Sequence, residues 1–224
     1  MNNAKLSQRT QADERGIHCV RHSSIPPRRA GARPQGRPRS ELANRAIIGT
    51  TLDMLAEGQT VTALSVEGIA ARAKVGKATI YRRWAHKHSL ILDAIGELDE
   101  PPVVMSQRST REDLELITRE LWKWALHSKS ARVLPQLVGA QRSAPELLRR
   151  YDEVVIEPWR TLLRQALLRG TGTGEVRHDT DLDLAVKVLI GPPLTQLVLG
   201  FPDGRAHAPV VGLAYSGVAG ELPR

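Results

Sequence analysis

Four polar side chains of types that bind nucleic acid lie within seven residues of the chain: Lys77, Thr79, Tyr81 and Arg83. In the same segment, Ile80 and Trp84 are four residues apart and therefore share one face of a helix. If this apolar face is buried, the polar side chains are left on or near the opposite side. A lysine, a small alcohol and a phenol on an exposed helix suit a groove lined by phosphates.

The surrounding residues predict two short helices that would position these side chains. Ser65 is a good N-cap for a helix over residues 65–73, and Glu67 places a carboxylate in its first turn, where the helix dipole favours it. A three-residue break follows, after which Gly76 can cap a second helix over residues 77–84, though more weakly than a serine would. Two helices joined by such a turn are the helix-turn-helix pattern, whose second helix enters the major groove of DNA.

Residues 40–95 resemble the N-terminal domain of TetR-type transcriptional repressors. The resemblance rests on the two helices, on the Tyr-Arg-Arg-Trp run that begins at Tyr81, and on Lys87 at the start of the following helix. Two positions differ from the family pattern. Lys74 stands in the turn where the family often has glycine, which predicts a non-glycine residue at positive φ. Gly76 stands where the family often has serine, so one hydroxyl contact to phosphate is lost.

The resemblance implies a DNA-contacting surface that extends from an N-terminal arm to the fourth helix. Its predicted members are Arg37, Arg39, Arg45, Ser65, Lys74, Gly76, Lys77, Ala78, Thr79, Tyr81, Arg82, Arg83 and Lys87. Within this set we expect Lys77 and Thr79 to contact bases, with a phosphate contact alone as the alternative for Lys77. Tyr81 and Lys87 are expected to contact phosphate. Arg45 could reach a phosphate or equally face solvent.

The excess of positive charge, +8 in total, is concentrated at the N-terminal end. Lys and Arg outnumber Asp and Glu by nine to two in residues 1–39 and by seven to five in residues 40–96, whereas residues 97–224 carry sixteen against seventeen. This asymmetry suits a polyanionic partner at one end only. Few apolar residues and several prolines predict disorder in the first segment. It is a solvated tail, a stretch that precedes the true start of translation, or an arm whose Arg37 and Arg39 enter a minor groove.

The rest of the sequence predicts helices, because no stretch alternates with period two. The expected helices cover residues 40–57 with Ser40 as N-cap, 86–100, 110–127, 132–141, 145–169 and 181–200, with a short helix near 210–218. Gly58 should end the first of these, and the glycine-rich residues 170–174 should form a flexible loop. Gly191-Pro192-Pro193 should kink the helix that contains it or leave carbonyls without donors.

We therefore predict an all-α protein with three parts. Residues 1–39 form a basic arm, residues 40–96 a three-helix DNA-binding domain with a helix-turn-helix, and residues 97–224 a larger helical domain for ligand binding and dimerisation. Trp122, Trp124 and Trp159 are either core residues or the lining of a ligand cavity, and the resemblance makes the cavity as good an interpretation as the core. The predicted ligand-contacting set is Trp122, Leu126, Trp159 and Leu163.

Other chemistry has little support in the sequence. Cys19 is the single cysteine, which excludes an internal disulfide and a multi-cysteine zinc site. The acidic residues that follow His178 precede a helix, where carboxylates are favoured without any metal. No phosphate loop, nucleophile elbow or catalytic carboxylate pair occurs at usable spacing, so no catalytic residue, metal or cofactor is predicted. Charges and prolines interrupt the apolar residues 182–199, and residues 1–21 are polar, which predicts a cytoplasmic protein without a membrane span.

These features favour a homodimeric transcription factor. In the leading hypothesis it is a repressor that binds double-stranded DNA at a palindromic operator and responds to a small-molecule effector bound by its C-terminal domain. The alternative is a ligand-independent DNA-binding or architectural protein that uses its basic arm for affinity. A third hypothesis, an enzyme in the C-terminal domain, is disfavoured because no catalytic constellation is found.

Overall fold

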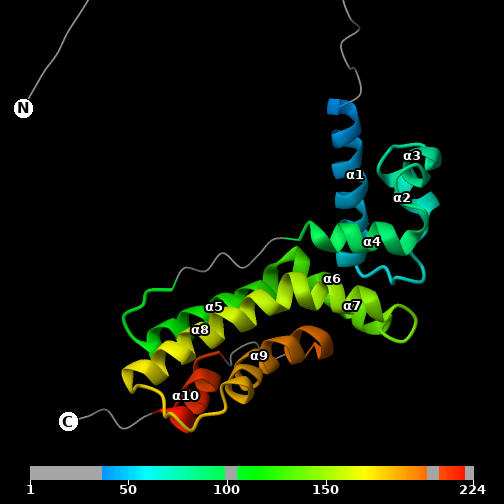
Figure 1. The fold of residues 1–224 in the computed structure, drawn as a ribbon. Helices are drawn as coiled ribbons and strands as arrows, with labels where there is room; N and C mark the ends of the chain where they lie inside the picture. The colour runs from blue at the N-terminus through cyan, green and yellow to red at the C-terminus, as the bar shows by residue number, and fades with distance from the viewer. Residues whose placement is uncertain (1–36, 99–104, 201–206, 220–224) are drawn as a thin grey trace, which may run out of the picture. The chain divides into compact units, whose positions relative to one another are not determined.

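The computed structural model describes residues 37–98, 105–200 and 207–219. These ranges are helical apart from turns and one isolated antiparallel bridge between Val176 and Ala219, so the predicted all-α fold is confirmed (Figure 1). The helices are α1 (Arg37–Ala56), α2 (Val66–Arg72), α3 (Lys77–Tyr81), α4 (Lys87–Gly96), α5 (Thr110–His127), α6 (Lys129–Gly139), α7 (Pro145–Tyr151), the π-helical turn η1 (Asp152–Ile156), α8 (Glu157–Thr173), α9 (Leu182–Leu199) and α10 (His207–Val218).

Helix α1 begins three residues earlier than predicted and ends as predicted to within one residue. Ser40 therefore lies in its first turn and is not its N-cap. Gly58 follows the last turn with a φ of 98°, which glycine adopts without strain. The N–H groups of Gly58 and Gln59 donate to the carbonyls of Leu55 and Met54, each at 3.0 Å. This pair of bonds is the Schellman ending of a helix.

The first four helices share one buried core. Each contributes a side chain that is at most 1% exposed: Leu55, Ile69, Ile80 and Ile91. Trp84 is also buried, and its indole N–H donates to Asp93 of α4 at 2.7 Å. The apolar face predicted from Ile80 and Trp84 is therefore confirmed, although α3 ends at Tyr81 and the tryptophan lies in the turn beyond it.

A single residue joins α5 to α6. Helix α5 spans the predicted residues 110–127, and Ser128 is both its C-cap and the N-cap of α6. The Ser128 hydroxyl accepts from the N–H of Ala131 at 2.9 Å, so α6 begins three residues before its predicted start. Tyr151 of α7 is buried at this corner, where its hydroxyl donates to the Ser130 carbonyl at 2.9 Å. Burial raises the pKa of Tyr151, which keeps the phenol a neutral donor.

Helices α7, η1 and α8 form one continuous helical segment that runs through the predicted loop. The expectation of a flexible loop over residues 170–174 is wrong, because α8 extends to Thr173. Gly170 lies in α8 against Thr110 and Val176, where an added Cβ would approach side-chain atoms to 2.5 and 2.7 Å. This glycine therefore allows close packing inside a helix rather than flexibility. Gly174, with a φ of 81°, ends the helix.

Helix α9 passes through both of its prolines as one helix. Because Pro192 and Pro193 have no N–H, they cannot donate to the carbonyls of Val188 and Leu189, as the sequence suggested. The Thr195 hydroxyl donates to the Gly191 carbonyl at 2.9 Å in the same stretch. Helix α10 is longer than the short helix predicted near residues 210–218, and it packs against α5 and α9.

One carboxylate is fully buried in the second half of the chain. Asp113, in the first turn of α5, accepts from the N–H groups of Ser106 and Gln107 at 2.6 and 3.1 Å and pairs with Arg169 of α8. Burial by itself would raise the pKa of Asp113, but these hydrogen bonds outweigh it and lower the pKa below its usual value. The carboxyl group of Asp113 is therefore held in its ionised form, and its ion pair with Arg169 links α5 to α8.

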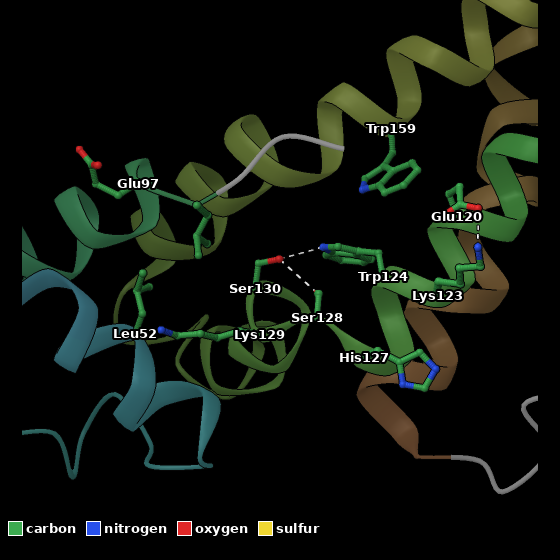
Figure 2. A pocket seen from close by; sticks show the side chains of 11 residues that line it. Leu52, Glu97, Glu120, Lys123, Trp124, His127, Ser128, Lys129, Ser130 and Trp159 are labelled. Carbon is green, nitrogen blue, oxygen red and sulfur yellow. Dashed lines mark hydrogen bonds and ion pairs between the residues drawn. The ribbon is translucent and has the colours of Figure 1, made fainter. Parts of the chain in front are cut away.

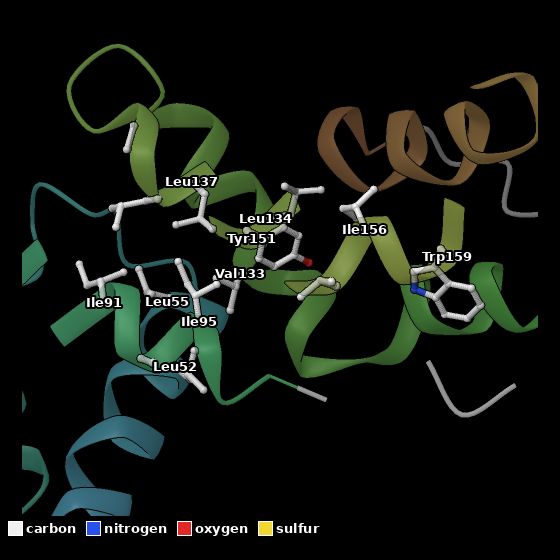
Figure 3. Close-up of a cluster of buried hydrophobic side chains, with 14 of the residues drawn as sticks. Leu52, Leu55, Ile91, Ile95, Val133, Leu134, Leu137, Tyr151, Ile156 and Trp159 are labelled. Atoms are coloured by element: carbon white, nitrogen blue, oxygen red, sulfur yellow. The ribbon is translucent and has the colours of Figure 1, made fainter. Parts of the chain in front are cut away.

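The described residues from 37 onward form one compact unit in which the first four helices contact the following helices directly. Helix α1 packs against α6, and α4 packs against α7. Figure 3 shows the shared core, with Leu55 and Ile95 of α1 and α4 beside Val133 and Leu137 of α6. Any movement of α6 or α7 must therefore act on the two helices that support the helix-turn-helix.

Candidate DNA-binding surface and ligand cavity

Helix α3 presents most of its polar side chains to solvent. Lys77 and Ala78 in its first turn are exposed, Thr79 is half-buried, and Tyr81 is 51% exposed. Ile80, on the other side of the helix, is 1% exposed and holds α3 to the core. The surface predicted for DNA contact is thus accessible. Arg82 is also exposed, whereas Arg83 is half-buried, and both follow the last residue of α3.

Lys74 has the left-handed backbone that the sequence predicted. Its φ is 55°, its N–H donates to the carbonyl of Ala71 at 3.3 Å, and the N–H of Val75 donates to Ala70 at 3.0 Å. This is a Schellman ending of α2 in which lysine takes the usual place of glycine. A residue with a Cβ in this conformation costs about 1 kcal/mol. The Lys74 side chain is exposed to solvent, three residues before α3 begins.

Two predicted DNA contacts, Ser65 and Gly76, already serve as helix caps. The Ser65 hydroxyl oxygen accepts from the N–H of Gly68 at 3.0 Å and so caps α2. Its proton remains able to donate, because a hydroxyl has one donor and two acceptor positions. Gly76 caps α3 through its backbone alone, with the N–H of Thr79 donating to its carbonyl at 2.8 Å.

Lys77, the residue predicted to contact bases, is paired with an acidic side chain. Its Nζ lies 2.9 Å from a carboxylate oxygen of Glu67, and both side chains are 55% exposed. The hydrogen bond from Lys77 lowers the pKa of Glu67. An exposed pair of this kind is weak and is screened by salt. Contact between Lys77 and DNA would require this ion pair to open or to be shared.

Lys87, the residue predicted to contact phosphate, is hydrogen-bonded within the protein. Its Nζ lies 2.7 Å from the carbonyls of Val61 and Leu64 and 3.3 Å from that of Thr62. An ammonium group has three protons, so all of them have acceptors in the α1–α2 loop. Lys87 thereby ties this loop to the start of α4. A phosphate contact would require Nζ to leave one of these carbonyls.

The predicted contacts on α1 are only partly described. Arg45 is exposed on this helix and so remains able to reach a phosphate. The backbones of Arg37 and Arg39 belong to the first turn of α1, but their side chains lie outside the described residues. The rest of the predicted basic arm, residues 1–36, lies outside them as well.

A cavity of about 680 Å³ lies where the first helices meet the following ones (Figure 2). Leu52 of α1, Leu98 after α4, Trp124 of α5, Ser130 of α6 and Trp159 of α8 all contribute to its lining. This volume lies within the range of small-molecule sites, about 300–1,000 Å³. The helices that carry the DNA-binding surface and the helices of the second half therefore share one candidate ligand site.

Only one of the four predicted ligand-contacting residues, Trp159, lines this cavity. Trp122 and Leu163 are buried in the core, and Leu126 is 43% exposed. Successive residues of a helix are about 100° apart, so positions 122 and 126 face away from position 124. Trp124, one of the three tryptophans considered for a cavity but not a member of the predicted set, is the tryptophan of α5 that faces the cavity.

The polar groups of the cavity are mostly paired with one another. The Trp124 indole N–H donates to the Ser130 hydroxyl at 2.9 Å, and Lys123 pairs with Glu120 at 2.7 Å. Lys129 pairs with Asp53 of α1. This last ion pair crosses from α6 to α1, so it belongs to the same junction as the cavity.

A second polar contact connects the two halves of the compact unit. His88 of α4 lies 3.6 Å from Glu146 in the first turn of α7, and both side chains are partly exposed. Together with the pair between Lys129 and Asp53, it links α1 and α4 to α6 and α7. Exposed pairs add little stability, so these contacts can exchange at small cost if the helices shift.

The acidic residues after His178 have individual structural roles. Asp179 pairs with Arg177 at 3.0 Å, Asp181 caps α9 by accepting from Leu184 at 3.0 Å, and Asp183 pairs with Arg164. Among the described residues, no group of three or more His, Cys, Asp or Glu side chains is arranged to hold a metal ion.

Helix α9 is long and apolar enough to cross a membrane by length and composition alone. Only 28% of this 18-residue stretch is buried within the chain. Several of its apolar residues are exposed, including Leu184 at 57% and Val188 at 45%. The prediction of no membrane span rested on Asp183, Lys187 and Pro192-Pro193. Leu184 and Val188 are four residues apart and share one exposed face of α9.

Two family descriptions match the chain. "Bacterial regulatory proteins, tetR family" matches residues 47–94, within α1 to α4. "Tetracyclin repressor-like, C-terminal domain" matches residues 106–209, from just before α5 into α10. The two matches fall on either side of the junction that contains the cavity.

Curated relatives and a solved structure are similar over most of the chain. YdeS of Bacillus subtilis, an uncharacterized HTH-type transcriptional regulator, is 30% identical over 166 residues, which cover 74% of this chain and 83% of the relative. The DNA-binding transcriptional repressor TetR of Mycobacteroides abscessus is 26% identical over 166 residues, and this alignment covers 73% of this chain and 86% of the relative. The crystal structure of FadR from Bacillus subtilis in complex with stearoyl-CoA superposes with a TM-score of 0.58 at 19% sequence identity. The superposition covers 77% of this chain and 98% of the FadR chain.

Proposed function

Because the chain belongs to the TetR family of transcriptional regulators, we propose that it is a ligand-responsive repressor that binds a palindromic DNA operator as a homodimer. The observation that carries the proposal is the cavity of about 680 Å³, which is lined by α1 and the residues just after α4 on one side and by α5, α6 and α8 on the other. In this proposal, residues 40–96 bind DNA, residues 97–224 bind the effector and form the dimer, and the protein acts in the cytoplasm.

The exposed side of α3 supports the proposed operator contacts. Lys77 lies in its first turn, from which a lysine can donate to guanine O6 and N7 in the major groove. Thr79 is half-buried one turn above Gly76, so its methyl and hydroxyl can meet a base edge at close range. Tyr81, half exposed at the end of α3, can donate its hydroxyl to a phosphate.

The apolar surface of α9 and α10 supports the homodimer. Leu184 and Val188 of α9 and Leu213 of α10, which is 76% exposed, line a shallow groove between these helices. Exposed apolar side chains that lie together in this way are typical of protein–protein contact surfaces. A second copy can cover it with the same surface about a twofold axis. The two α3 helices would then address half-sites one DNA turn, about 34–36 Å, apart.

The cavity offers a route from effector to operator. A ligand in it would touch Leu52 and Leu98 on one side and Trp124 and Trp159 on the other. It would therefore favour one spacing between the DNA-binding helices and the second half, whereas operator DNA favours the spacing that matches its half-sites. Ligand and operator are coupled to the extent that each prefers a different geometry.

Selection of bound sequences from a random DNA pool tests this proposal. We expect an inverted repeat whose half-sites are centred about 34–36 Å apart, bound by two copies of the protein. A single asymmetric site would refute the homodimer on a palindrome. Binding without sequence preference would refute the repressor and favour the alternative, an architectural protein that depends on its basic N-terminal residues.

A further inference from the structure

Trp159 carries a polar group that the protein leaves without a partner. The side chain is 1% exposed and lines the cavity, yet its indole N–H has no hydrogen-bond partner in the described part of the chain. Two other tryptophans have partners: Trp84 donates to Asp93 at 2.7 Å and Trp124 to Ser130 at 2.9 Å. A buried donor without an acceptor is unfavourable, and such groups are uncommon in native proteins.

The indole N–H of Trp159 is directed at the cavity. Figure 2 shows the nitrogen atoms of Trp124 and Trp159 turned toward the same side, where Ser130 lies. The Ser130 hydroxyl is engaged by Trp124 and by Ser128, whose hydroxyl oxygen is 3.2 Å away. The site therefore contains one donor that is satisfied by the protein and one that is not.

Two aromatic rings form the walls beside this donor. The ring centroids of Trp124 and Trp159 are 6.1 Å apart and the ring planes are inclined by 52°. Leu52 and Leu98 add apolar surface on the side of α1 and α4. Indole faces and edges bind flat aromatic groups by stacking and edge-to-face contact, for which inclined walls provide both geometries.

Three charged side chains of the lining are already paired within the protein, and a fourth, Glu97, is exposed to solvent just after α4. Lys123 is paired with Glu120, and Lys129 with Asp53. A charged ligand would have to displace one of these partners or enter beside a like charge. An uncharged ligand leaves both pairs intact.

We propose that this cavity binds an uncharged, planar aromatic molecule that carries an oxygen acceptor, such as a carbonyl, for the indole N–H of Trp159. The inference rests on the proposed function, in which the cavity is the effector site, and it names the chemical class of the effector. An unbranched acyl chain cannot stack on the two indole rings, and its methylene groups cannot accept a hydrogen bond from the Trp159 N–H. A flat aromatic hydrocarbon can stack on the indole rings but leaves the Trp159 N–H without an acceptor.

Three uncharged probes with nine carbon atoms separate these possibilities. 1-Indanone is flat, aromatic and carries a carbonyl; indane is the same ring system without the carbonyl; 2-nonanone has the carbonyl on an open chain. Each is titrated into the ¹⁵N-labelled full chain while the indole N–H signals of its four tryptophans are followed. The Trp122→Phe and Trp159→Phe variants identify two of these signals, and Trp122 does not line the cavity.

We expect 1-indanone to shift the Trp159 proton signal downfield in a saturable manner and to leave the Trp122 signal in place. It should bind roughly tenfold more tightly than indane, because only the ketone pairs the buried donor. It should also bind more tightly than 2-nonanone, which loses chain entropy on binding. Trp159→Phe should abolish the preference for 1-indanone over indane, and Trp122→Phe should preserve it. The wild-type spectra decide the matter if Trp159→Phe does not fold.

Other results would overturn the assignment. Equal affinity for 1-indanone and indane, a Trp159 signal that does not move at saturation, or tighter binding of 2-nonanone would each refute it, as would failure of 1-indanone to bind. Operator affinity measured in the same samples distinguishes this inference from the proposed function. If 1-indanone binds as expected and operator affinity is unchanged, the site is correct but it is not the effector site. If other compounds release the operator and 1-indanone does not bind, the regulator is correct and the ligand class is wrong.

Discussion

Replacing Lys87 with methionine separates its structural contacts from a direct contact to DNA. Methionine keeps an apolar stem of similar length but removes the ammonium that donates to the carbonyls of Val61, Thr62 and Leu64. Hydrogen bonds from charged donors contribute about 1.5–3 kcal/mol each when partly buried. Two of the three bonds are short and part-buried, and water can replace some of the loss, so we expect destabilisation of about 3 kcal/mol.

Two measurements on the same variant decide between the roles. The free energy of unfolding is obtained from urea titration at fixed protein concentration, because the stability of the proposed dimer would depend on concentration. The salt slope of operator affinity is measured in parallel. If Lys87 is structural, stability falls and the slope stays unchanged. If it neutralises a phosphate, the slope falls by about one and stability is nearly unchanged, and that result would refute the structural interpretation.

Lys77→Met is the matched control for this experiment. Lys77 is exposed and forms a surface ion pair with Glu67. Its loss should leave stability nearly unchanged and lower operator affinity. In a selection of bound sequences, the variant should relax preference at one symmetric pair of operator positions. A uniform loss of affinity with every preference retained would show that Lys77 contacts phosphate only.

Lys74→Gly should stabilise the protein by about 0.5–1 kcal/mol in urea titrations, because glycine adopts the positive φ without strain; destabilisation would contradict the strained turn. Asp113→Asn should lower the free energy of unfolding by about 3 kcal/mol. Because the pKa of native Asp113 is lowered, its stabilising contribution should be complete above the unfolded pKa of 3.8 and disappear as pH falls through the folded pKa. An unchanged acid-unfolding profile in the variant would refute the role of this pair. Glu67→Gln should raise operator affinity at low salt by releasing Lys77, and an equal or lower affinity would show that the pair does not compete with DNA.

The DNA-binding half could be predicted closely because its determinants are local. Ser65 as a cap and the spacing of Ile80 and Trp84 fix the helix-turn-helix within about twenty residues. The positive φ of Lys74 was predicted from the family resemblance, because the family often has glycine at this position of the turn. Lys87 is different, since its role depends on carbonyls more than twenty residues away that no local pattern places near it.

The second half could be predicted as helices but not as a site. Gly170 lies in a glycine-rich segment that is typical of a loop, and only its contacts with Thr110 and Val176 show why a glycine is required in a helix. The rotation of α5 about its axis, which directs Trp124 rather than Trp122 to the cavity, is set by packing against α8 and α9. Periodicity identifies the apolar residues of such a helix, but neighbouring helices decide which of them line a cavity.

The central claim is that the cavity and the operator surface are coupled, and thermodynamic reciprocity tests it most directly. A compound that raises the melting temperature of the wild type but not of Trp159→Phe is chosen as the ligand, and its affinity is measured with and without the selected operator. Operator affinity is then measured with and without the ligand. The account predicts that each lowers the affinity of the other by the same factor, at least about fivefold. A ligand that saturates the cavity while operator affinity stays unchanged would contradict it.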